Sequence, residues 1–379
     1  MRGVSIVGAG MIRFGKFPSR MIEDMGAEAV IQALRHAGMG HREIQAAFVG
    51  NVGQPPNAGQ RILDQAGMSG VPVLNHENAC SSSSAALRDA YVAVASGEYD
   101  RVLVVGAEQM TKKIKGLIPI EDGANLMVDM GMVMPAFFAL MARRHMQEYG
   151  TTREQLAQVS VKNHRHGALN PYAQYQKEVT LSEVLNSAVI AEPITLLQCT
   201  PIGDGAAALV MTTSREARRW TSRPVKVEAS VFAAGFSRKE PSVGTIEVCC
   251  RAARQTYEIA GIGPEDMDVV ELHDCFTAHE ILAVEDLGLA PKGEGGRMAV
   301  EGTTALGGKI PVNPSGGLLS KGHPLGATGV AQVVELVWQL RGECGKRQVA
   351  GAKVALAHNG GGIGPGLELP AMSITILSG

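Results

Sequence analysis

Residues 78–108 read NACSSSSAALRDAYVAVASGEYDRVLVVGAE and contain the unit from which the fold is built. Cys80 precedes a run of small residues, and residues 84–96 are predicted to form a helix. The apolar run 101–106 follows as a buried strand and leads into Glu108. One helix–strand unit therefore has a reactive side chain before its helix and a polar side chain after its strand.

The same order returns after His323. Residues 326–340 predict a second helix, and residues 353–357 predict a second strand that ends at His358 and Asn359. Two copies of one unit imply two related halves, and a pseudo-twofold axis would bring their polar ends together. The alternative is that helices and strands alternate in any α/β chain, so that the order repeats without a duplication.

The remaining pattern indicates the α/β class, with a mainly parallel sheet covered by helices. Residues 22–38 predict an amphipathic helix, and residues 47–52 predict a buried strand. Residues 111–195 depart from this alternation and are interpreted as an inserted loop domain that covers the core. We therefore predict an N-terminal half of residues 1–220, which carries this insertion, and a C-terminal half of residues 221–379.

Charge and hydropathy exclude several classes of protein. The 379 residues carry 35 Lys and Arg against 37 Asp and Glu, so no net positive field attracts nucleic acid or an anionic membrane. Hydrophobic residues make up 45% of the chain, as in a compact globular protein. No uncharged run approaches the ~18 residues that a membrane span requires. We expect no nucleic-acid or membrane partner.

The six cysteines are too sparse for a disulfide scaffold and form no CxxC pair of the kind that zinc sites use. We expect reduced thiols and no metal site. The strand-like run 4–8 leaves no room for a signal peptide, so the cytoplasm is the expected compartment.

Cys80 is the first candidate for catalysis. Unpaired N–H groups and the dipole at a helix N-terminus favour a thiolate, which is the nucleophilic form of cysteine. An inert buried thiol is the usual alternative, and a serine nucleophile is a second one. The chain has no Gly-x-Ser-x-Gly elbow to support the serine.

Glycines surround His323 in the run NPSGGLLSKGHPLG, residues 313–326. Such a backbone passes close to a ligand and aims an imidazole at a partner group, which suits a general base. A phosphate-binding loop is the rival interpretation, but the spacing matches neither the dinucleotide fingerprint nor the Walker motif.

Two further motifs end predicted strands. Residues 269–276 form an apolar strand that ends in His273, Asp274 and Cys275, and a His and a Cys two residues apart point the same way. Residues 358–364 begin with a histidine and continue in glycines whose bare N–H groups could form an oxyanion hole. A histidine with a purely structural role is the alternative for His358.

Together these motifs resemble the thiolase superfamily, and within it the sterol-carrier-protein-2-type thiolases. The resemblance covers essentially the whole chain. The residues that carry it are Asn-Ala-Cys at Cys80, Asp204-Gly205-Ala206-Ala207, His273-Asp274-Cys275-Phe276, residues 313–329 and His358-Asn359-Gly360. It implies a five-layered αβαβα fold with two related halves, an inserted loop domain, and a homodimer or homotetramer.

The resemblance also implies a ping-pong acyl transfer between coenzyme A thioesters, with no tightly bound cofactor. Cys80 would carry the acyl group, His323 would activate its thiol and help to hold the enolate oxygen, and Cys275 would move the α-proton. His273 would support the first oxyanion hole, and the N–H groups of Cys80 and Gly360 would form the second.

Most thiolases place the acid/base cysteine where this chain has His358, and the sterol-carrier type takes it from the His-Asp-Cys-Phe motif instead. This chain agrees with the sterol-carrier type at both places, because it has His358 at the first and Cys275 in the motif. We also expect Ser315 and Gly316 to contact coenzyme A.

Two alternatives stay open: transfer of the acyl group from Cys80 to an acceptor other than coenzyme A, and a non-catalytic coenzyme-A-binding subunit. Because no sterol-carrier domain follows, lipid transfer is not expected. The resemblance motivates a zinc-ribbon/OB-fold (DUF35-type) partner protein.

Overall fold

The computed structural model describes residues 1–118, 126–236, 244–364 and 368–379. Its main sheet has nine strands in the order β3-β2-β4-β7-β1-β8-β11-β10-β9. These strands are β1 (Val4–Met11), β2 (Ala46–Gly50), β3 (Val73–His76), β4 (Arg101–Gln109), β7 (Asp204–Thr213), β8 (Val225–Ala233), β9 (Val269–Glu271), β10 (Val354–Gly361) and β11 (Ala371–Ser378). A separate pair consists of β5 (Val189–Ala191) and β6 (Ile194–Thr195).

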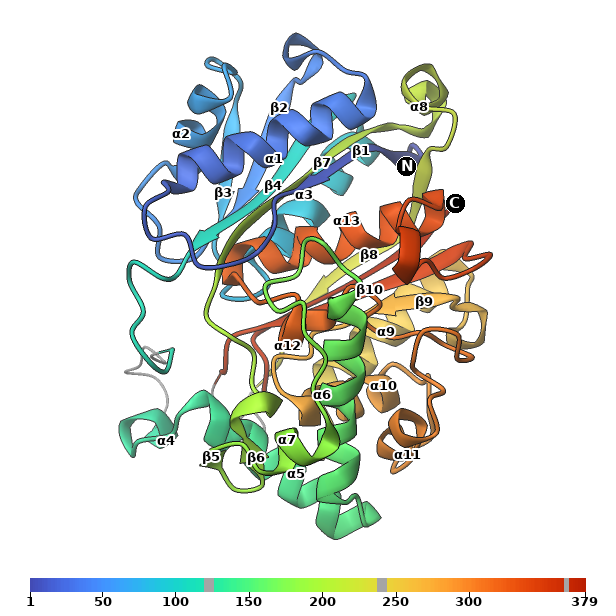
Figure 1. Cartoon of the computed structure of the whole chain (residues 1–379). Helices are drawn as coiled ribbons and strands as arrows, with labels where there is room; N and C mark the ends of the chain where they lie inside the picture. Colours follow the sequence, from blue (N-terminus) through green and yellow to red (C-terminus); the bar gives the residue numbers. More distant parts are fainter. Residues whose placement is uncertain (119–125, 237–243, 365–367) are drawn as a thin grey trace.

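The helices lie on both faces of this sheet and in the insertion (Figure 1). They are α1 (Ile22–Ala37), α2 (Ala58–Gln65), α3 (Ser82–Ser96), α4 (Leu126–Asp129), α5 (Met134–Tyr149), α6 (Arg153–Ala168), α7 (Leu181–Leu185), α8 (Ser214–Trp220), α9 (Glu247–Ala260), α10 (Thr277–Asp286), α11 (Gly295–Val300), α12 (Gly317–Ser320) and α13 (Thr328–Arg341). Of the helices that the described residues form, none is both long and apolar enough to cross a membrane.

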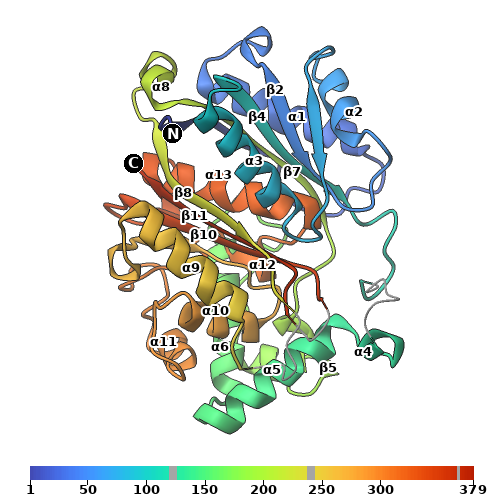
Figure 2. The same ribbon diagram turned by 180° about the vertical axis from the view of Figure 1, so that it is seen from behind.

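The sheet bends between β1 and β8, so that its two parts enclose α3 and α13 (Figures 1 and 2). Helices α1 and α2 cover the outer face of the N-terminal part, and α9 and α10 cover the outer face of the C-terminal part. The resulting layers are helix, sheet, helix, sheet, helix. This confirms the five-layered αβαβα fold predicted above.

The sheet is mixed, so the prediction of a mainly parallel sheet was wrong. The parallel pairs are β2 with β3, β2 with β4, and β9 with β10, whereas the other pairs are antiparallel. Strand β11 follows β10 after a short connection and therefore returns beside it in the opposite direction. Strand β7 returns antiparallel to β4 after the insertion.

The central layer explains the small residues of α3. Helix α13 is buried almost throughout, which leaves little room between the two helices. A side chain at Gly329 would collide with the backbone and hydroxyl of Ser84. The N–H of Val330 donates to the hydroxyl of Ser83 across the same contact. Small residues at this crossing therefore let the two halves approach closely.

The ends of β4 and β10 each form hydrogen bonds with the opposite half. Glu108, at the end of β4, accepts a hydrogen bond of 3.0 Å from the N–H of Gly326, just before α13. Asn359, near the end of β10, accepts hydrogen bonds from the hydroxyl of Ser81, just before α3. Each half thus holds the start of the central helix of the other half.

Several element boundaries differ from the sequence predictions. The helix predicted at 22–38 is α1, which ends at Gly38 in the left-handed conformation. Strand β10 runs through His358 and Gly360 to Gly361, because it pairs with β11 along its whole length. Strand β9 is much shorter than the predicted run 269–276. Val270 of β9 pairs with Val312. Beyond the strand, the N–H of Leu272 donates to the side chain of Asn313, the residue after Val312, instead of to a neighbouring strand.

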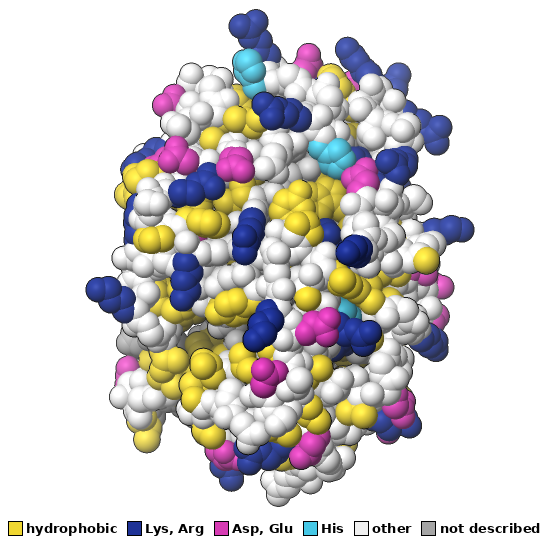
Figure 3. All heavy atoms as spheres, viewed as in Figure 1, with side chains coloured by type: hydrophobic (Ala, Val, Ile, Leu, Met, Phe, Trp, Pro, Cys, Tyr) yellow, Lys and Arg dark blue, Asp and Glu magenta, His cyan; other side chains and the backbone are white. Residues whose placement is uncertain are grey.

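The predicted insertion corresponds to the segment between β4 and β7. Its residues 119–125 lie outside the described ranges. Helix α6 packs against α10, α11 and α12 of the C-terminal half. The half boundary predicted at residues 220 and 221 stays a prediction. Figure 3 shows Lys, Arg, Asp and Glu side chains scattered over one face, in keeping with the near-neutral net charge.

Candidate active site

The predicted catalytic residues meet from both halves of the molecule. Cys80 lies in the turn before α3, and His323 lies in the loop before α13. His273 and Cys275 follow β9, and His358 lies on β10. The sulfur of Cys80 and one ring nitrogen each of His273 and His323 lie within 4.8 Å of one another. The structure therefore brings the nucleophile candidate to the base candidate.

The Cys80 turn is strained and firmly held. Ala79 has a φ of 48°, in a region that residues other than glycine rarely adopt. The hydroxyl of Ser82 accepts the N–H of Asn78 and donates to the carbonyl oxygen of Ala79. These bonds turn the half-buried Cys80 to face the opposite half.

The thiol of Cys80 is not the ready thiolate that its helix position predicts. Burial raises its pKa to about 12, although the amides of Gly362 and of Cys80 itself act in the opposite direction. Desolvation of the charged form outweighs the favourable dipole of α3. For Cys80 to act as a nucleophile, a base must first remove its thiol proton.

His323 has the geometry of that base. Its Nδ1 lies 2.7 Å from the hydroxyl of Thr328, and this hydroxyl donates to the carbonyl oxygen of Pro324. The hydroxyl therefore accepts from Nδ1–H, and Nε2 keeps its lone pair. Burial lowers the pKa of His323 to about 3, so the ring is neutral at pH 7 and can accept a proton.

His273 is oriented as a hydrogen-bond donor. The hydroxyl of Ser81 donates to Oδ1 of Asn359, at 2.9 Å, and Nδ2 of Asn359 lies 3.0 Å from Nδ1 of His273. We infer that Nδ1 accepts and that Nε2 carries the proton. The rings of His273 and His323 meet edge to face, with centroids 4.9 Å apart. A neutral donor beside the base suits a developing oxyanion.

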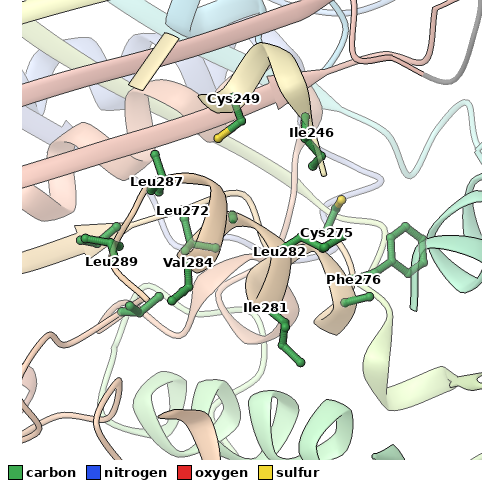
Figure 4. Packing of buried hydrophobic residues seen from close by; sticks show 14 of the residues in the cluster. Ile246, Cys249, Leu272, Cys275, Phe276, Ile281, Leu282, Val284, Leu287 and Leu289 are labelled. Carbon is green, nitrogen blue, oxygen red and sulfur yellow. The ribbon is translucent and has the colours of Figure 1, made fainter. Parts of the chain in front are cut away.

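Cys275 is buried two residues before α10, beside Phe276 and Leu282 in the apolar cluster that Figure 4 shows. Burial raises the pKa of its thiol well above the usual value, and Cys80 and Asp274 act in the same direction. Its sulfur lies 3.3 Å from Nδ1 of His279, one helical turn along the chain. The sequence prediction did not include His279.

His358 contacts the backbone of the His273 loop. Its Nδ1 accepts the N–H of His273 at 3.3 Å, and burial lowers the pKa of the ring to about 3. Gly360 pairs with Met372 in the register of β10 and β11. The glycine whose amide reaches the sulfur of Cys80 is Gly362, the first residue after β10. The oxyanion-hole role of Gly360 stays a prediction.

Ser315 and Gly316 lie below the surface. The hydroxyl and the N–H of Ser315 both donate to the carboxylate of Glu271, at 2.7 Å and 3.0 Å. Gly316 packs against the backbone of Gly167 of α6. In this structure the two residues support the glycine-rich loop, and their contact with coenzyme A stays a prediction.

A charged layer lies beneath the histidines. Asp274 accepts the N–H groups of Leu318 and Leu319, which anchors α12 to the His-Asp-Cys turn. Lys162 of α6 forms a buried ion pair of 2.9 Å with Glu280 of α10. Breaking such a buried pair leaves an unpaired charge, so this layer holds the loops with the candidate catalytic residues in place.

The insertion covers this site from one side. The ring of Phe138, on α5, stacks on Phe276 at 4.7 Å and lies 5.2 Å from the ring of His279. The N–H of Thr200 donates to the carbonyl oxygen of Cys275. Aromatic cover of this kind excludes water from a reacting pair.

The same groups are spaced closely enough to coordinate a metal ion, in two sets that share His273: Cys80 with His323, and Cys275 with His279. The expectation from the sequence that the protein has no metal site stays a prediction. A surface cavity of about 730 Å³, lined in part by Tyr172 and Trp338, lies apart from the site.

Sequence reasoning missed three partners of these residues. His279 could have been found from its spacing of four after Cys275, because residues four apart share a helix face. The sequence places Asn359 at a strand end but gives it no partner, and Thr328 carries no signal of its own. Asn359 meets His273 because β10 pairs with β9, and Thr328 meets His323 because the chain turns between them at the start of α13.

The chain is similar to known proteins along most of its length. Residues 4–215 match the family model "Thiolase, N-terminal domain", and residues 236–367 match "Thiolase C-terminal domain-like". The chain is 44% identical to the acetyl-CoA acetyltransferase of Methanothermobacter thermautotrophicus, over 96% of this chain and 97% of that protein. It is 42% identical to sterol carrier protein 2 of Bos taurus, over 94% of this chain and 69% of that protein.

Two solved structures are similar over nearly the whole chain. The Ltp2-ChsH2(DUF35) aldolase matches with a TM-score of 0.85 and 25% identity, over 99% of this chain and 97% of that chain. Human mitochondrial 3-ketoacyl-CoA thiolase matches with a TM-score of 0.74 and 17% identity, over 100% and 98%, which is a likeness of fold.

Proposed function

The chain belongs to the thiolase family of acyltransferases, and we propose that it catalyses reversible condensation and thiolytic cleavage of 3-ketoacyl-CoA through an acyl group on Cys80. The observation that carries this proposal is the approach of the Cys80 sulfur to neutral ring nitrogens of His273 and His323, within 4.8 Å. A thiol, a base and a hydrogen-bond donor at this spacing suit covalent acyl transfer.

In the first half-reaction His323 Nε2 takes the thiol proton of Cys80 as its sulfur attacks the thioester carbonyl. The tetrahedral oxyanion is held by backbone N–H groups, for which we propose Cys80 and Gly360, with the amide of Gly362 close to the same sulfur. Coenzyme A then leaves with the proton that His323 returns. The acyl group remains on Cys80 as a thioester.

In the second half-reaction Cys275 removes the α-proton of a second acyl-CoA. The enolate oxygen accepts a hydrogen bond from Nε2–H of His273, and the enolate carbon attacks the acyl group on Cys80. Nε2 of the neutral His323 carries no proton, so it donates no hydrogen bond to the enolate in this proposal. In this proposal His358 positions the turn that carries His273, through their contact, and transfers no proton.

The test is covalent labelling. Incubation with acetyl-CoA alone should add the mass of one acetyl group to the peptide that contains Cys80. Acetylation of another residue, or none, would refute the assigned nucleophile. Loss of the label on addition of free coenzyme A would exclude the non-catalytic subunit, and turnover that needs coenzyme A would exclude a different acceptor.

The similarity to an aldolase structure favours one second candidate, which is carbon–carbon bond cleavage without an acyl-enzyme. The neutral ring of His279 could accept a hydroxyl proton in such a reaction. The labelling experiment separates the two reactions, because retro-aldol cleavage leaves Cys80 unmodified.

The same structure includes a DUF35 component in its name, which supports our proposal of a zinc-ribbon/OB-fold partner for this chain. We also propose a homodimer or homotetramer, and a cytoplasmic location for a protein whose six cysteines are free thiols. Co-purification from the source cells, followed by mass spectrometry and size-exclusion chromatography, tests the partner and the assembly.

A further inference from the structure

His279 is a buried histidine in contact with Cys275, and the thiolase reaction proposed above assigns it no role. Its side chain is almost fully buried on α10, with Nδ1 3.3 Å from the sulfur of Cys275. Its ring lies 5.4 Å from that of His273 and 5.7 Å from that of His358. Across the part of the chain that the structure describes, no hydrogen-bond partner satisfies its Nε2.

Cys275 needs such an acceptor. To take an α-proton, its thiol must first lose its own proton, and burial opposes this. The amides of Phe276 and of Cys275 itself favour the thiolate, but an amide cannot accept a proton. The nearest group that can accept one is Nδ1 of His279.

The histidine is in the right state for this task. Burial lowers its pKa well below the usual value, and the neighbouring rings of His358 and His323 act in the same direction. The ring is therefore neutral at pH 7. Since Nδ1 faces a thiol, we infer that Nδ1 accepts and that Nε2 carries the ring proton.

We propose that His279 is the general base of Cys275, so that the two residues act as a proton relay during enolate formation. This proposal rests on the proposed function and extends it by one residue. The relay needs no oxidant, metal or added reactant, because it moves only protons.

Two protons move in the forward step. The S–H proton of Cys275 passes to Nδ1 of His279 as the sulfur takes the α-proton of the second acyl-CoA. The electron pair of the broken C–H bond becomes the enolate, and the ring of His279 becomes the cation. After the enolate attacks the acyl group, the leaving thiolate of Cys80 receives the Cys275 proton, and His279 returns its proton to Cys275.

The relay predicts a split between two measurable steps. His279→Asn should acylate Cys80 from acetyl-CoA within about threefold of the native rate. It should lose α-deuterium from deuterated acetyl-CoA about 10²-fold more slowly, which is the scale of a lost general base. His164→Asn is a matched control, because His164 is a buried histidine whose Nδ1 bonds Ser160 of its own helix. The control should change neither rate.

The pH dependence separates a base from a structural residue. Without His279, exchange must wait for the thiolate of Cys275, so the exchange rate of the variant should rise with pH and approach the native rate. The titratable groups that face His279 are Cys275, His273, His323 and His358, and all remain in the variant. A change that only loosened α10 would slow both steps at every pH.

Three results would overturn the relay: exchange within about threefold of native in His279→Asn, equal loss of acylation and exchange in both His279→Asn and His279→Gln, or no recovery at high pH. Exchange does not pass through an acyl-enzyme. A failure to label Cys80 in the native protein would therefore refute the proposed function, while the exchange rates would still decide the role of His279.

Discussion

The two halves of the molecule share one plan but differ in chemistry. In each, a reactive residue precedes a central helix and a polar residue ends a strand: Cys80 and Glu108 in the N-terminal half, His323 and Asn359 in the C-terminal half. The N-terminal half supplies the candidate nucleophile. The C-terminal half supplies the candidate proton-transfer and oxyanion groups.

Because of this difference, the candidate nucleophile and its candidate base come from different halves. The crossed contacts of Glu108 with Gly326 and of Asn359 with Ser81 then bring Cys80 and His323 together. Burial keeps both groups neutral, because it raises the pKa of the thiol to about 12 and lowers that of the imidazole to about 3. The site therefore holds its protons until a substrate arrives.

The largest loss of activity should follow a substitution in the N-terminal half. Cys80→Ala removes the covalent intermediate, and thiolysis should fall by about 10⁴-fold or more. Cys250→Ala removes a half-buried thiol on α9 and should retain native activity. Steady-state thiolysis assays on both variants measure this. Substantial turnover in Cys80→Ala would move the nucleophile to another residue.

Two residues of the C-terminal half, Cys275 and His358, should affect the acylation and turnover rates to different extents. Cys275→Ala should still acetylate Cys80 while condensation and thiolysis fall by about 10²–10⁴-fold, as expected for a lost acid/base. His358→Ala should do less damage, since His358 contacts a backbone amide. Acylation bursts and steady-state rates on both variants decide the order. Normal turnover in Cys275→Ala would return the acid/base role to His358.

The two strand ends should respond to acid in opposite directions. Burial lowers the pKa of His358 to about 3, so the unfolded chain binds the extra proton and stability falls as pH drops below about 6.5. Burial raises the pKa of Glu108 to about 7, so the folded state binds the extra proton and stability rises as pH drops from 7.

Each group therefore contributes about 2 kcal/mol to the change in unfolding free energy between pH 7 and pH 5, with opposite sign. His358→Gln should reduce the loss of stability in acid, and Glu108→Gln should increase it. Urea unfolding at both pH values measures the difference. A change of the same sign in both variants would contradict the opposite roles of the strand ends.

The smallest effect should come from Thr328→Val. This change keeps the shape of the side chain but removes the oxygen that accepts from Nδ1–H of His323. The ring then loses its fixed orientation, and acylation of Cys80 should slow about tenfold, in line with the ~1.4 kcal/mol of one hydrogen bond. Stopped-flow acylation measures this. Ser230→Ala, which removes a buried hydroxyl on β8, is the control and should leave the rate unchanged.

Much of this protein could be predicted from the order of residues along the chain. Local chemistry marks Cys80 and His323, because a thiol before a run of small residues and an imidazole among glycines have few structural reasons to occur. Periodicity predicts the helices that follow them, since an apolar face repeats along each. These signals lie within a few residues of one another, so they need no knowledge of distant contacts.

Only the tertiary structure decided which groups touch and in which protonation state. Strand β10 extends past its predicted end because β11 pairs with it, and Asn359 reaches His273 because Ser81 of the other half holds its amide. The neutral state of Cys80 is also a property of the folded protein, because burial outweighs the helix dipole that the local sequence suggests. Desolvation depends on every residue packed around a group, and the chain assembles those residues from both halves.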